Sequence, residues 1–593
     1  MASTATTVET AHVKPQSADS TSTKSRLKKL KPQLSDIAVA ATFILIAIYV
    51  QMQVMPALRY GIAHPGDPYF FEWMFSHAAY SVTHLENPFF TERLGAPQGV
   101  NILANTSVLG LGIPLAPVTL LFGAHTTYLI AITAGLAATG ISWYWLLSRH
   151  VTEHRAAAML GAAICGFGPA IVSHAHGHVN FVSQFLVPII VWRFLKLAEP
   201  GSHIRNGIIF GLVASYQIFI GEEVLFFTGL ACLVFGIVFA ITHRIPRPRI
   251  YALLKGFGVA LATATPLLAY PLYMQFLGPQ AYHGIPEFVT DWGADLTSYI
   301  AFSSESLAGD AKAATKFAPN STEENTFIGF PLVLVLIVAG VWLRKNRLAL
   351  ALTITGVTFF ILSLGPTLII SGTHTRIPLP WRVLQQLPLF NSVLPGRLGL
   401  VVWPICAVLV ALALDKALSA PKGLKVAWIV AISCALLPIA PTPLASFKQG
   451  ATPVFFASGH WRDYLSEGRT LATIPLPSTH DHSMRWAVED DLAFRLPRGY
   501  FLGPATEGGR GMWGSPYRPT STLLDTVAYR NRPHTITDKH RAQAAKDFEF
   551  WQAGLVVLPP HPAERALLKT MQGLLGPAQR VDDVWIWQLP APR

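Results

Sequence analysis

Long apolar runs, separated by short polar segments, dominate the pattern of hydrophobic and polar positions along the chain. Most of these runs are close to the ~20 residues that an α-helix needs to cross the ~30 Å hydrocarbon layer of a bilayer. The pattern predicts an all-α polytopic membrane domain with about eleven transmembrane helices. The predicted spans are residues 36–55, 126–147, 156–173, 180–197, 205–220, 224–242, 252–275, 327–343, 348–371, 398–416 and 425–441.

The basic residues between the spans alternate between the two predicted sides of the membrane. Cytoplasmic loops are enriched in Lys and Arg, whereas the turns at His174–His178 and Gly221–Glu223 contain neither. We therefore expect the N-terminus to be cytoplasmic and these two turns to be external. The predicted cytoplasmic clusters are Arg149/Arg155, Arg193/Lys196/Arg205, Arg244/Arg247/Arg249, Arg344/Lys345/Arg347 and Lys416/Lys422/Lys425.

One apolar segment, Ser107–Gly123, does not fit this alternation. If it crossed the membrane, every later loop would change sides. It also contains Pro114 and Pro117, and its 17 residues are at the short limit for a span. We interpret it as an interfacial or re-entrant helix within a long first external loop, residues 56–125.

The two ends of the chain differ from the apolar middle. Residues 1–35 are rich in Ser, Thr and Lys, which predicts a disordered basic cytoplasmic tail. The run that follows is too long for a secretory signal, so we expect a retained first helix. Eleven crossings place residues 442–593 outside, where strand-like runs at 470–474, 554–558 and 584–588 and a helical stretch at 538–551 predict a small extracytoplasmic α/β domain.

Composition agrees with a membrane protein. The 593 residues are 51% hydrophobic and 13% charged, against roughly a quarter charged in soluble domains. The net charge of +12 comes mainly from the loop clusters, which argues against nucleic-acid binding. The four cysteines all lie inside apolar stretches, so we interpret them as small buried hydrophobes.

Polar groups gather on the predicted external side. The first external loop contains Asp67 and Glu72 and continues into a segment with apolar residues at helical spacing. This spacing predicts an amphipathic helix that lies along the membrane surface and holds Asp67 close to it. The apolar stripe is Phe71, Met74, Phe75, Ala78, Val82 and Leu85, and the opposite face is Trp73, His77, Tyr80 and His84.

This arrangement resembles the GT-C glycosyltransferases, membrane enzymes that take a sugar from a polyprenyl-phosphate carrier on the external face. The likeness lies in the retained first helix, the acidic residue just beyond it, the long first loop and the many later spans. Several segments are similar to bacterial members: Asn87–Phe90, Pro97–Val100, Asn105–Ser107 and the apolar segment after it, His176–Asn180, Asp295–Tyr299, Leu379–Trp381 and Pro395–Arg397.

The resemblance implies a role for the first-loop carboxylates. Asp67 matches the acidic residue that acts as general base on the acceptor hydroxyl, which requires a carboxylate within ~3 Å of that hydroxyl. A single displacement would invert the anomeric carbon. Where family members often have two adjacent acidic residues, Pro68 follows Asp67, and Glu72 is the next carboxylate. The alternative role of Asp67 is that of a turn residue in Gly-Asp-Pro.

The leaving phosphate would need a cation. Arg397 stands where an external loop enters the next span, and Arg382 lies earlier in that loop. A guanidinium can hold two phosphate oxygens, so both are candidates for binding the donor phosphate, Arg397 first. The alternative is an interfacial arginine that reaches towards lipid headgroups.

A second polar group surrounds the external histidine turn. Alternate histidines on an extended turn, with a glutamate opposite, allow a divalent metal at His176, His178 and Glu222. Alternatively, these residues hydrogen-bond a polar sugar or one another at the mouth of the cavity. Trp292, in a later external loop, offers a flat surface for a sugar. The candidates for sugar or metal contact are His174, His176, His178, Asn180, Glu222 and Glu223.

These features favour a glycosyltransferase that moves a sugar from a polyprenyl-phosphate donor to an extracytoplasmic glycan or lipid acceptor. The resemblance implies a multi-pass protein of the bacterial plasma membrane. A transporter or flippase of a lipid-linked cell-envelope precursor is the alternative. We find no convincing internal repeat and no acidic residue or histidine in mid-span, both of which ion-coupled transport would favour. An assembly or accessory protein would leave the external polar cluster unexplained.

Overall fold

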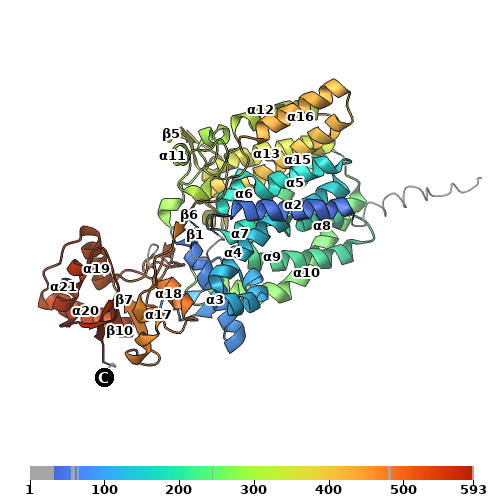
Figure 1. Cartoon of the computed structure of the whole chain (residues 1–593). Coiled ribbons are helices and arrows are strands. Elements are labelled where there is room, and N and C mark those ends of the chain that lie inside the picture. Colours follow the sequence, from blue (N-terminus) through green and yellow to red (C-terminus); the bar gives the residue numbers. More distant parts are fainter. Residues whose placement is uncertain (1–32, 55–59, 63–65, 244, 479–481, 591–593) are drawn as a thin grey trace, which may run out of the picture.

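The computed structural model describes residues 33–54, 60–62, 66–243, 245–478 and 482–590. The predicted N-terminal tail therefore lies almost wholly outside the described residues. A bundle of long helices forms one part, and a smaller part built around a sheet forms the other, with helix α3 (Asp67–His84) between them (Figure 1).

The bundle contains the helices expected of a membrane protein. Five helical segments of the described chain are long and apolar enough to cross a bilayer: α4 (Leu109–His150), α5 and α6 together (Arg155–His174), α9 (His203–Thr242), α10 (Arg247–Leu277) and the segment Pro395–Leu418, which includes α15 (Gly399–Leu418). The shorter helices of the bundle are α2 (Leu34–Val50), α8 (Val187–Leu197), α12 (Phe330–Trp342), α13 (Arg347–Ser363) and α16 (Lys422–Leu436). The chain is thus a mostly helical membrane protein, and the number of crossings stays a prediction.

Two of the long helices are interrupted at glycine. Gly123 breaks α4 with a φ of 82°, a left-handed conformation that glycine adopts at little cost. The break separates the segment predicted to be re-entrant or interfacial from the following predicted span. Gly221 breaks α9 at the position of a predicted external turn, and a Cβ there would lie 3.2 Å from the Cβ of Asn180. The histidine turn therefore packs closely against this break.

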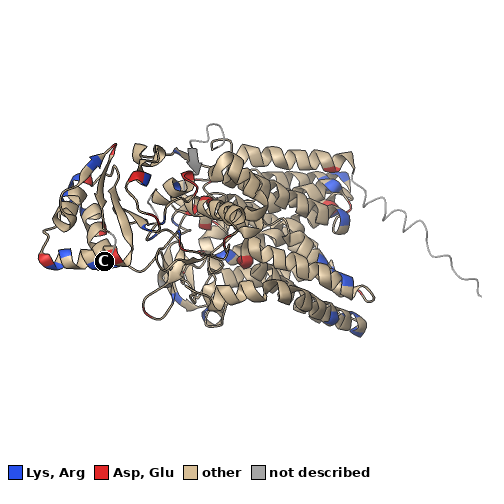
Figure 2. Ribbon diagram, turned by 90° about the horizontal axis from the view of Figure 1, so that it is seen from below, with Lys and Arg blue, Asp and Glu red and all other residues tan. Residues whose placement is uncertain are grey.

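Some charged residues of the bundle lie at the junction with the sheet part, and a second group lies at the helix ends far from it (Figure 2). There Asp36 forms ion pairs with Arg149, at 2.7 Å, and with Arg155, and Asp415 pairs with His154 at 2.9 Å. Three segments that were predicted to be cytoplasmic thus meet at one end of the bundle. This clustering agrees with the predicted alternation of charge, and the orientation in the membrane stays a prediction.

Helix α3 differs from its prediction. Only part of its predicted polar face is exposed: Trp73 and His77 are as inaccessible as Phe75, whereas Tyr80 is half-buried and His84 is exposed. Conversely, Val82 and Leu85 of the predicted apolar stripe are 46% and 92% exposed. The helix packs against α4 on one side and against α18 (Ser483–Glu489) of the sheet part on the other. The predicted division into an apolar and a polar face is therefore wrong for the first half of the helix, where both faces are buried, and its position at the membrane surface stays a prediction.

The burial of His77 makes stability depend on pH. Desolvation lowers the pKa of His77 from 6.5 to about 4, so the unfolded chain binds a proton that the folded chain excludes. We expect the free energy of unfolding to fall as the pH decreases from 6.5 to 4, by up to about 3 kcal/mol. Thermal unfolding midpoints of wild type and His77→Gln in detergent, from pH 7.5 to 4.5, measure this contribution.

The variant is expected to lose less stability than wild type across that window. His84→Gln is the matched control, since His84 lies on the same helix and is exposed. Equal acid sensitivity of wild type and His77→Gln would contradict the prediction.

The sheet part is built on four strands in the order β11-β12-β10-β7. β7 (Thr470–Thr473) runs parallel to β10 (Ala553–Leu558), while β12 (Val584–Gln588) is antiparallel to both β10 and β11 (Gln579–Val581). β7, β10 and β12 lie where strands were predicted, and α20 (Asp538–Phe550) lies where a helix was predicted. A separate apolar core joins this sheet to α19 (Pro519–Arg530), α20 and α21 (Glu564–Leu575). The boundaries of the predicted domain and its place outside the membrane stay predictions.

The loop that was predicted to be the first external one joins the two parts. Its strand β1 (Tyr60–Ile62) pairs with β6 (Ser446–Lys448), near the start of the sheet part. Asn105 exchanges two hydrogen bonds with the backbone of Leu502, at 2.9 and 2.7 Å. These contacts fix the sheet part over α3 and over the Asp67 end of that helix.

Candidate functional site

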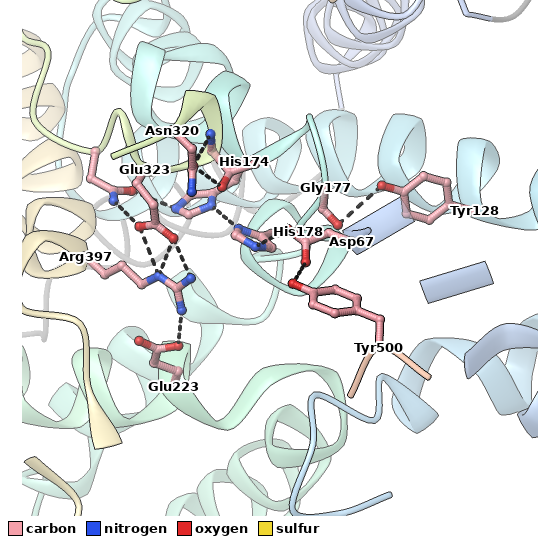
Figure 3. A network of polar contacts seen from close by, with 12 residues as sticks. Asp67, Tyr128, His174, Gly177, His178, Glu223, Asn320, Glu323, Arg397 and Tyr500 are labelled. Carbon is pink, nitrogen blue, oxygen red and sulfur yellow. Dashed lines mark hydrogen bonds and ion pairs between the residues drawn. The ribbon is translucent and has the colours of Figure 1, made fainter. Parts of the chain in front are cut away.

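Asp67 begins α3, and its side chain points into the junction between the two parts of the molecule. Gly66, with a φ of 91°, turns the chain into the helix, and Pro68 occupies its first turn. The Asp67 side chain is 14% exposed. Oδ1 accepts a hydrogen bond of 2.8 Å from the hydroxyl of Tyr500, and Oδ2 lies 3.1 Å from Nε2 of His178 (Figure 3).

Gly177 makes room for this carboxylate. A Cβ at Gly177 would lie 2.9 Å from the Asp67 Cβ and 3.2 Å from Oδ2, so a larger residue would displace Asp67. The carbonyl of Gly177 also lies 3.3 Å from the hydroxyl of the buried Tyr128, which holds the turn in place. The absence of a side chain at Gly177 thus brings the histidine turn against Asp67.

From Asp67 a chain of polar contacts leads into the bundle. Nδ1 of His178 lies 2.9 Å from Nδ1 of His174, and Nε2 of His174 lies 2.7 Å from Oδ1 of Asn325. Asn325 in turn donates from Nδ2 to Glu323 over 2.9 Å. The histidine turn is therefore tied through His174 to the loop that precedes α12.

The direction of these hydrogen bonds follows from their acceptors. The Glu323 carboxylate only accepts, so the Asn325 amide donates to it and presents Oδ1 to His174. His174 Nε2 then carries a hydrogen, and Nδ1 of this fully buried neutral ring accepts from His178 Nδ1. His178 Nε2 is left facing Oδ2 of Asp67.

Arg397 stands at the other end of the network, held by two glutamates. Its Nε lies 3.0 and 3.1 Å from the two carboxylate oxygens of Glu323, and Nη1 lies 2.9 Å from Glu223. Nη2 also donates to Glu323. The guanidinium lies over the ring of Phe181, 4.9 Å from its centre. Each of the three nitrogens thus gives one N–H to a glutamate, which leaves two of the five N–H groups for another anion.

Tyr500 is a donor over the whole working pH range. Burial raises the pKa of Tyr500 well above its ordinary value, and the neighbouring Asp67 carboxylate raises it further. The hydroxyl therefore keeps its proton and donates a hydrogen bond to Asp67.

The structure thus brings together Asp67, His174, His178, Glu223 and Arg397 from the predicted residues. Tyr500, Glu323 and Asn325 belong to the same network and were not predicted. Tyr500 is 433 positions from Asp67, and no local pattern marks it.

The other predicted residues have different partners. Glu72 is buried and pairs with His125 at 2.7 Å, and His176 lies 3.1 Å from Glu305. Glu222 accepts from Gln275 at 2.9 Å. Arg382 is exposed in the loop before Arg397, and Asn180 packs at the Gly221 break. Two of the possible metal ligands, His176 and Glu222, therefore have partners outside the network.

No metal site is evident in the described part of the chain, where no group of three or more His, Cys, Asp or Glu side chains is placed to hold an ion. Asp295 accepts hydrogen bonds from the backbone of Thr297, Ser371 and Gly372. It therefore organises the loop.

No protein-family model and no curated protein matches the sequence. Among solved structures, the chain is similar to the archaeal oligosaccharyltransferase AglB from Archaeoglobus fulgidus in complex with an inhibitory peptide and a dolichol-phosphate. The identity is 12%, over 89% of this chain and 69% of that chain, with a TM-score of 0.49. The apo form of the A. fulgidus oligosaccharyltransferase gives 13% identity over 88% and 69%, with a TM-score of 0.49. Its complex with Zn and sulfate gives 13% over 88% and 68%, with a TM-score of 0.45. Identities of 12% and 13% carry no information about the reaction of this chain, so its function rests on its own residues.

Proposed function

We propose that this chain is an inverting membrane glycosyltransferase of the GT-C type. It transfers a sugar from a polyprenyl-phosphate donor to a glycan or lipid acceptor on the external side of the membrane. The observation that supports this best is the Asp67 carboxylate, held between a hydroxyl donor and an imidazole at the junction of the membrane part and the sheet part.

The contacts of Asp67 suit a general base. Oδ2 faces the His178 ring, while Oδ1 receives a hydroxyl hydrogen bond of 2.8 Å from Tyr500. An acceptor hydroxyl that takes the place of the Tyr500 hydroxyl would give its proton to Oδ1 as its oxygen attacks the anomeric carbon. The bond between that carbon and the phosphate oxygen breaks with its electron pair going to the phosphate. Attack from the opposite side inverts the carbon.

Arg397 is the candidate that neutralises the leaving phosphate. Two of its N–H groups remain for phosphate oxygens, and the glutamates on its other positions fix the plane of the guanidinium. Arg382, exposed in the preceding loop, is a secondary candidate for the same phosphate before it enters the site.

A transporter or flippase of a lipid-linked precursor is the alternative function. Movement of an intact lipid-linked sugar requires no base, so the ordered contacts of Asp67 with His178 and Tyr500 would have no role in it.

The proposed enzyme lies in the plasma membrane of a bacterium, with its N-terminus in the cytoplasm and the sheet part outside. The basic helix ends remote from the sheet part support this orientation (Figure 2).

The test is sugar transfer by the purified full chain. Radiolabelled polyprenyl-phosphate sugars, each with one sugar, are supplied together with a glycan extract of cell envelopes, and label in the glycan is measured against label released to water. Transfer with inverted configuration supports the proposal. In proteoliposomes, movement of intact donor across the bilayer with no transfer from any donor would favour the transporter.

A further inference from the structure

Four aromatic side chains form a continuous line on the outer side of the site. We call this line the aromatic shelf: Trp292, Phe288, Trp513 and Tyr500. The ring centres of successive members lie 6.3, 4.7 and 6.4 Å apart. The first two come from the loop after α10 and the last two from the sheet part, so the shelf crosses the junction of the two parts.

Backbone contacts hold the two sides of the shelf together. The amide of His283 donates to the carbonyl of Gly509 over 3.1 Å, and the amide of Gly511 donates back to His283 over 3.2 Å. Arg510 donates from Nε to the carbonyl of Ile285 over 2.7 Å. Phe288 and Trp513 are therefore held in contact, with their ring planes tilted by 56°, before any ligand arrives, which lowers the entropy cost of binding.

Each end of the shelf reaches one end of the polar network. Tyr500 donates to Asp67, as described above. At the other end, the carbonyl of Trp292 accepts from the amide of Gly396, the residue before Arg397, over 3.1 Å. A small cavity beside Trp292 is also lined by Glu323 and Asn325 of the network. A ligand on the shelf would thus lie alongside the base and the candidate phosphate ligand.

The middle of the shelf is open to solvent. Phe288 is 57% exposed and Trp513 is 37% exposed, although neither belongs to a membrane helix. Leaving such large rings in water forgoes the free energy of burial, so an exposed aromatic surface next to a site indicates a ligand.

We propose that the aromatic shelf binds the acceptor, and that this acceptor is a neutral glycan whose sugar rings stack on Phe288 and Trp513. This inference rests on the proposed transfer reaction. The C–H face of a pyranose or furanose ring is apolar and flat, which suits an aromatic face, while its rim of hydroxyl groups stays in water. The terminal hydroxyl then replaces the Tyr500 hydroxyl at Asp67.

A peptide acceptor fits the shelf less well. An extended peptide binds a sheet by pairing with a free strand edge. Strand β9 (Gly511–Trp513), which carries Trp513, pairs with β8 (Leu502–Pro504) and is also hydrogen-bonded to His283 through Gly511. Strand β9 therefore has few backbone N–H and C=O groups left to pair with a peptide, whereas the exposed rings are accessible.

The test is binding of glycan without turnover. Neutral linear hexasaccharides of glucose, mannose and arabinose, each labelled with a fluorophore at the reducing end, are titrated with the full chain in detergent and followed by anisotropy. We expect at least one hexasaccharide to bind wild type. Phe288→Leu and Trp513→Leu are each expected to raise its Kd about tenfold, an effect of the size of one lost stacking contact.

Tyr529→Leu is the matched control, because Tyr529 is an exposed aromatic residue of α19 in the same part of the molecule. Its Kd should equal that of wild type. The inference is overturned if no hexasaccharide binds wild type, or if the two shelf variants bind hexasaccharide as tightly as Tyr529→Leu does. It is also overturned if the shelf variants keep their affinity for hexasaccharide and instead lose affinity for a neutral peptide or for phosphatidylcholine vesicles.

Measuring transfer and donor hydrolysis in the same preparations separates the two proposals. If the shelf is the acceptor site, the shelf variants lose transfer at low acceptor concentration and still hydrolyse donor at the wild-type rate. If both shelf variants transfer sugar as wild type does, the shelf is not the acceptor site, while the proposed transferase function is still supported. Shelf-dependent glycan binding without any transfer supports the shelf and contradicts the proposed reaction.

Discussion

Replacing Asp67 by asparagine is expected to lower the rate of sugar transfer roughly 10²–10⁴-fold, the usual contribution of a general base. The amide has the shape of the carboxylate and can still accept the Tyr500 hydrogen bond at Oδ1, so the junction of the two parts should persist. It cannot take a proton from the acceptor hydroxyl. The measurement is the single-turnover rate with labelled donor at saturating acceptor, together with the thermal unfolding midpoint.

Glu86→Gln is the matched control for this change. Glu86 lies two residues beyond the end of α3 opposite to Asp67 and is exposed, so the same loss of one carboxylate should leave transfer unchanged. A folded Asp67→Asn protein that transfers sugar at the wild-type rate would remove Asp67 from the mechanism. Glu72, buried against His125, would be the next carboxylate to test.

Replacing Arg397 by methionine is expected to have the largest effect on stability, about 3–5 kcal/mol, and to abolish transfer as well. The substitution leaves Glu223 and Glu323 without their shared cation, and both are largely shielded from water. Thermal unfolding midpoints in detergent measure the first effect, and single-turnover transfer measures the second.

A triple variant separates the structural role of Arg397 from its role at the phosphate. Glu223→Gln and Glu323→Gln remove the uncompensated charges, so adding them to Arg397→Met should restore most of the midpoint but none of the transfer. Arg376→Met, in the exposed part of the same loop, should change neither property. A single Arg397→Met protein as stable as wild type would contradict the buried ion-pair account.

The helical bundle could be predicted because its signals are local. Apolar run length and the sign of the flanking loops mark a membrane helix wherever it stands in the chain. The face of α3 could not be predicted in the same way. A stripe of apolar residues indicates one buried face, whereas Trp73 and His77 on the other face are buried too. The helix also packs against α18, which no local pattern indicates.

The candidate site also contains residues that local sequence signals predicted and residues that they did not. Asp67 and the histidine turn were predicted because they follow spans directly and have distinctive neighbours in the sequence. Glu323, Asn325 and Tyr500 stand in long external segments without regular spacing, and their role comes from contacts with residues 74 to 433 positions away. The ion pairs of Arg397 could not be predicted for the same reason. The sequence favoured a free cation there, whereas Glu323 and Glu223, from two distant segments, bind its guanidinium.

The hydrogen bond between Asp67 and Tyr500 also bears on how the protein matures. Its two ends are 433 positions apart, so the ribosome has made all of the predicted membrane helices before Tyr500 emerges. A nascent chain arrested within the bundle would expose Asp67 without Tyr500 and without Trp513. In the proposed function, such a chain could meet lipid-linked sugar in the membrane but would lack the acceptor shelf. Packing of the later-made sheet part onto the earlier-made first loop is therefore the step that brings Tyr500 and Trp513 to Asp67 in the newly synthesised protein.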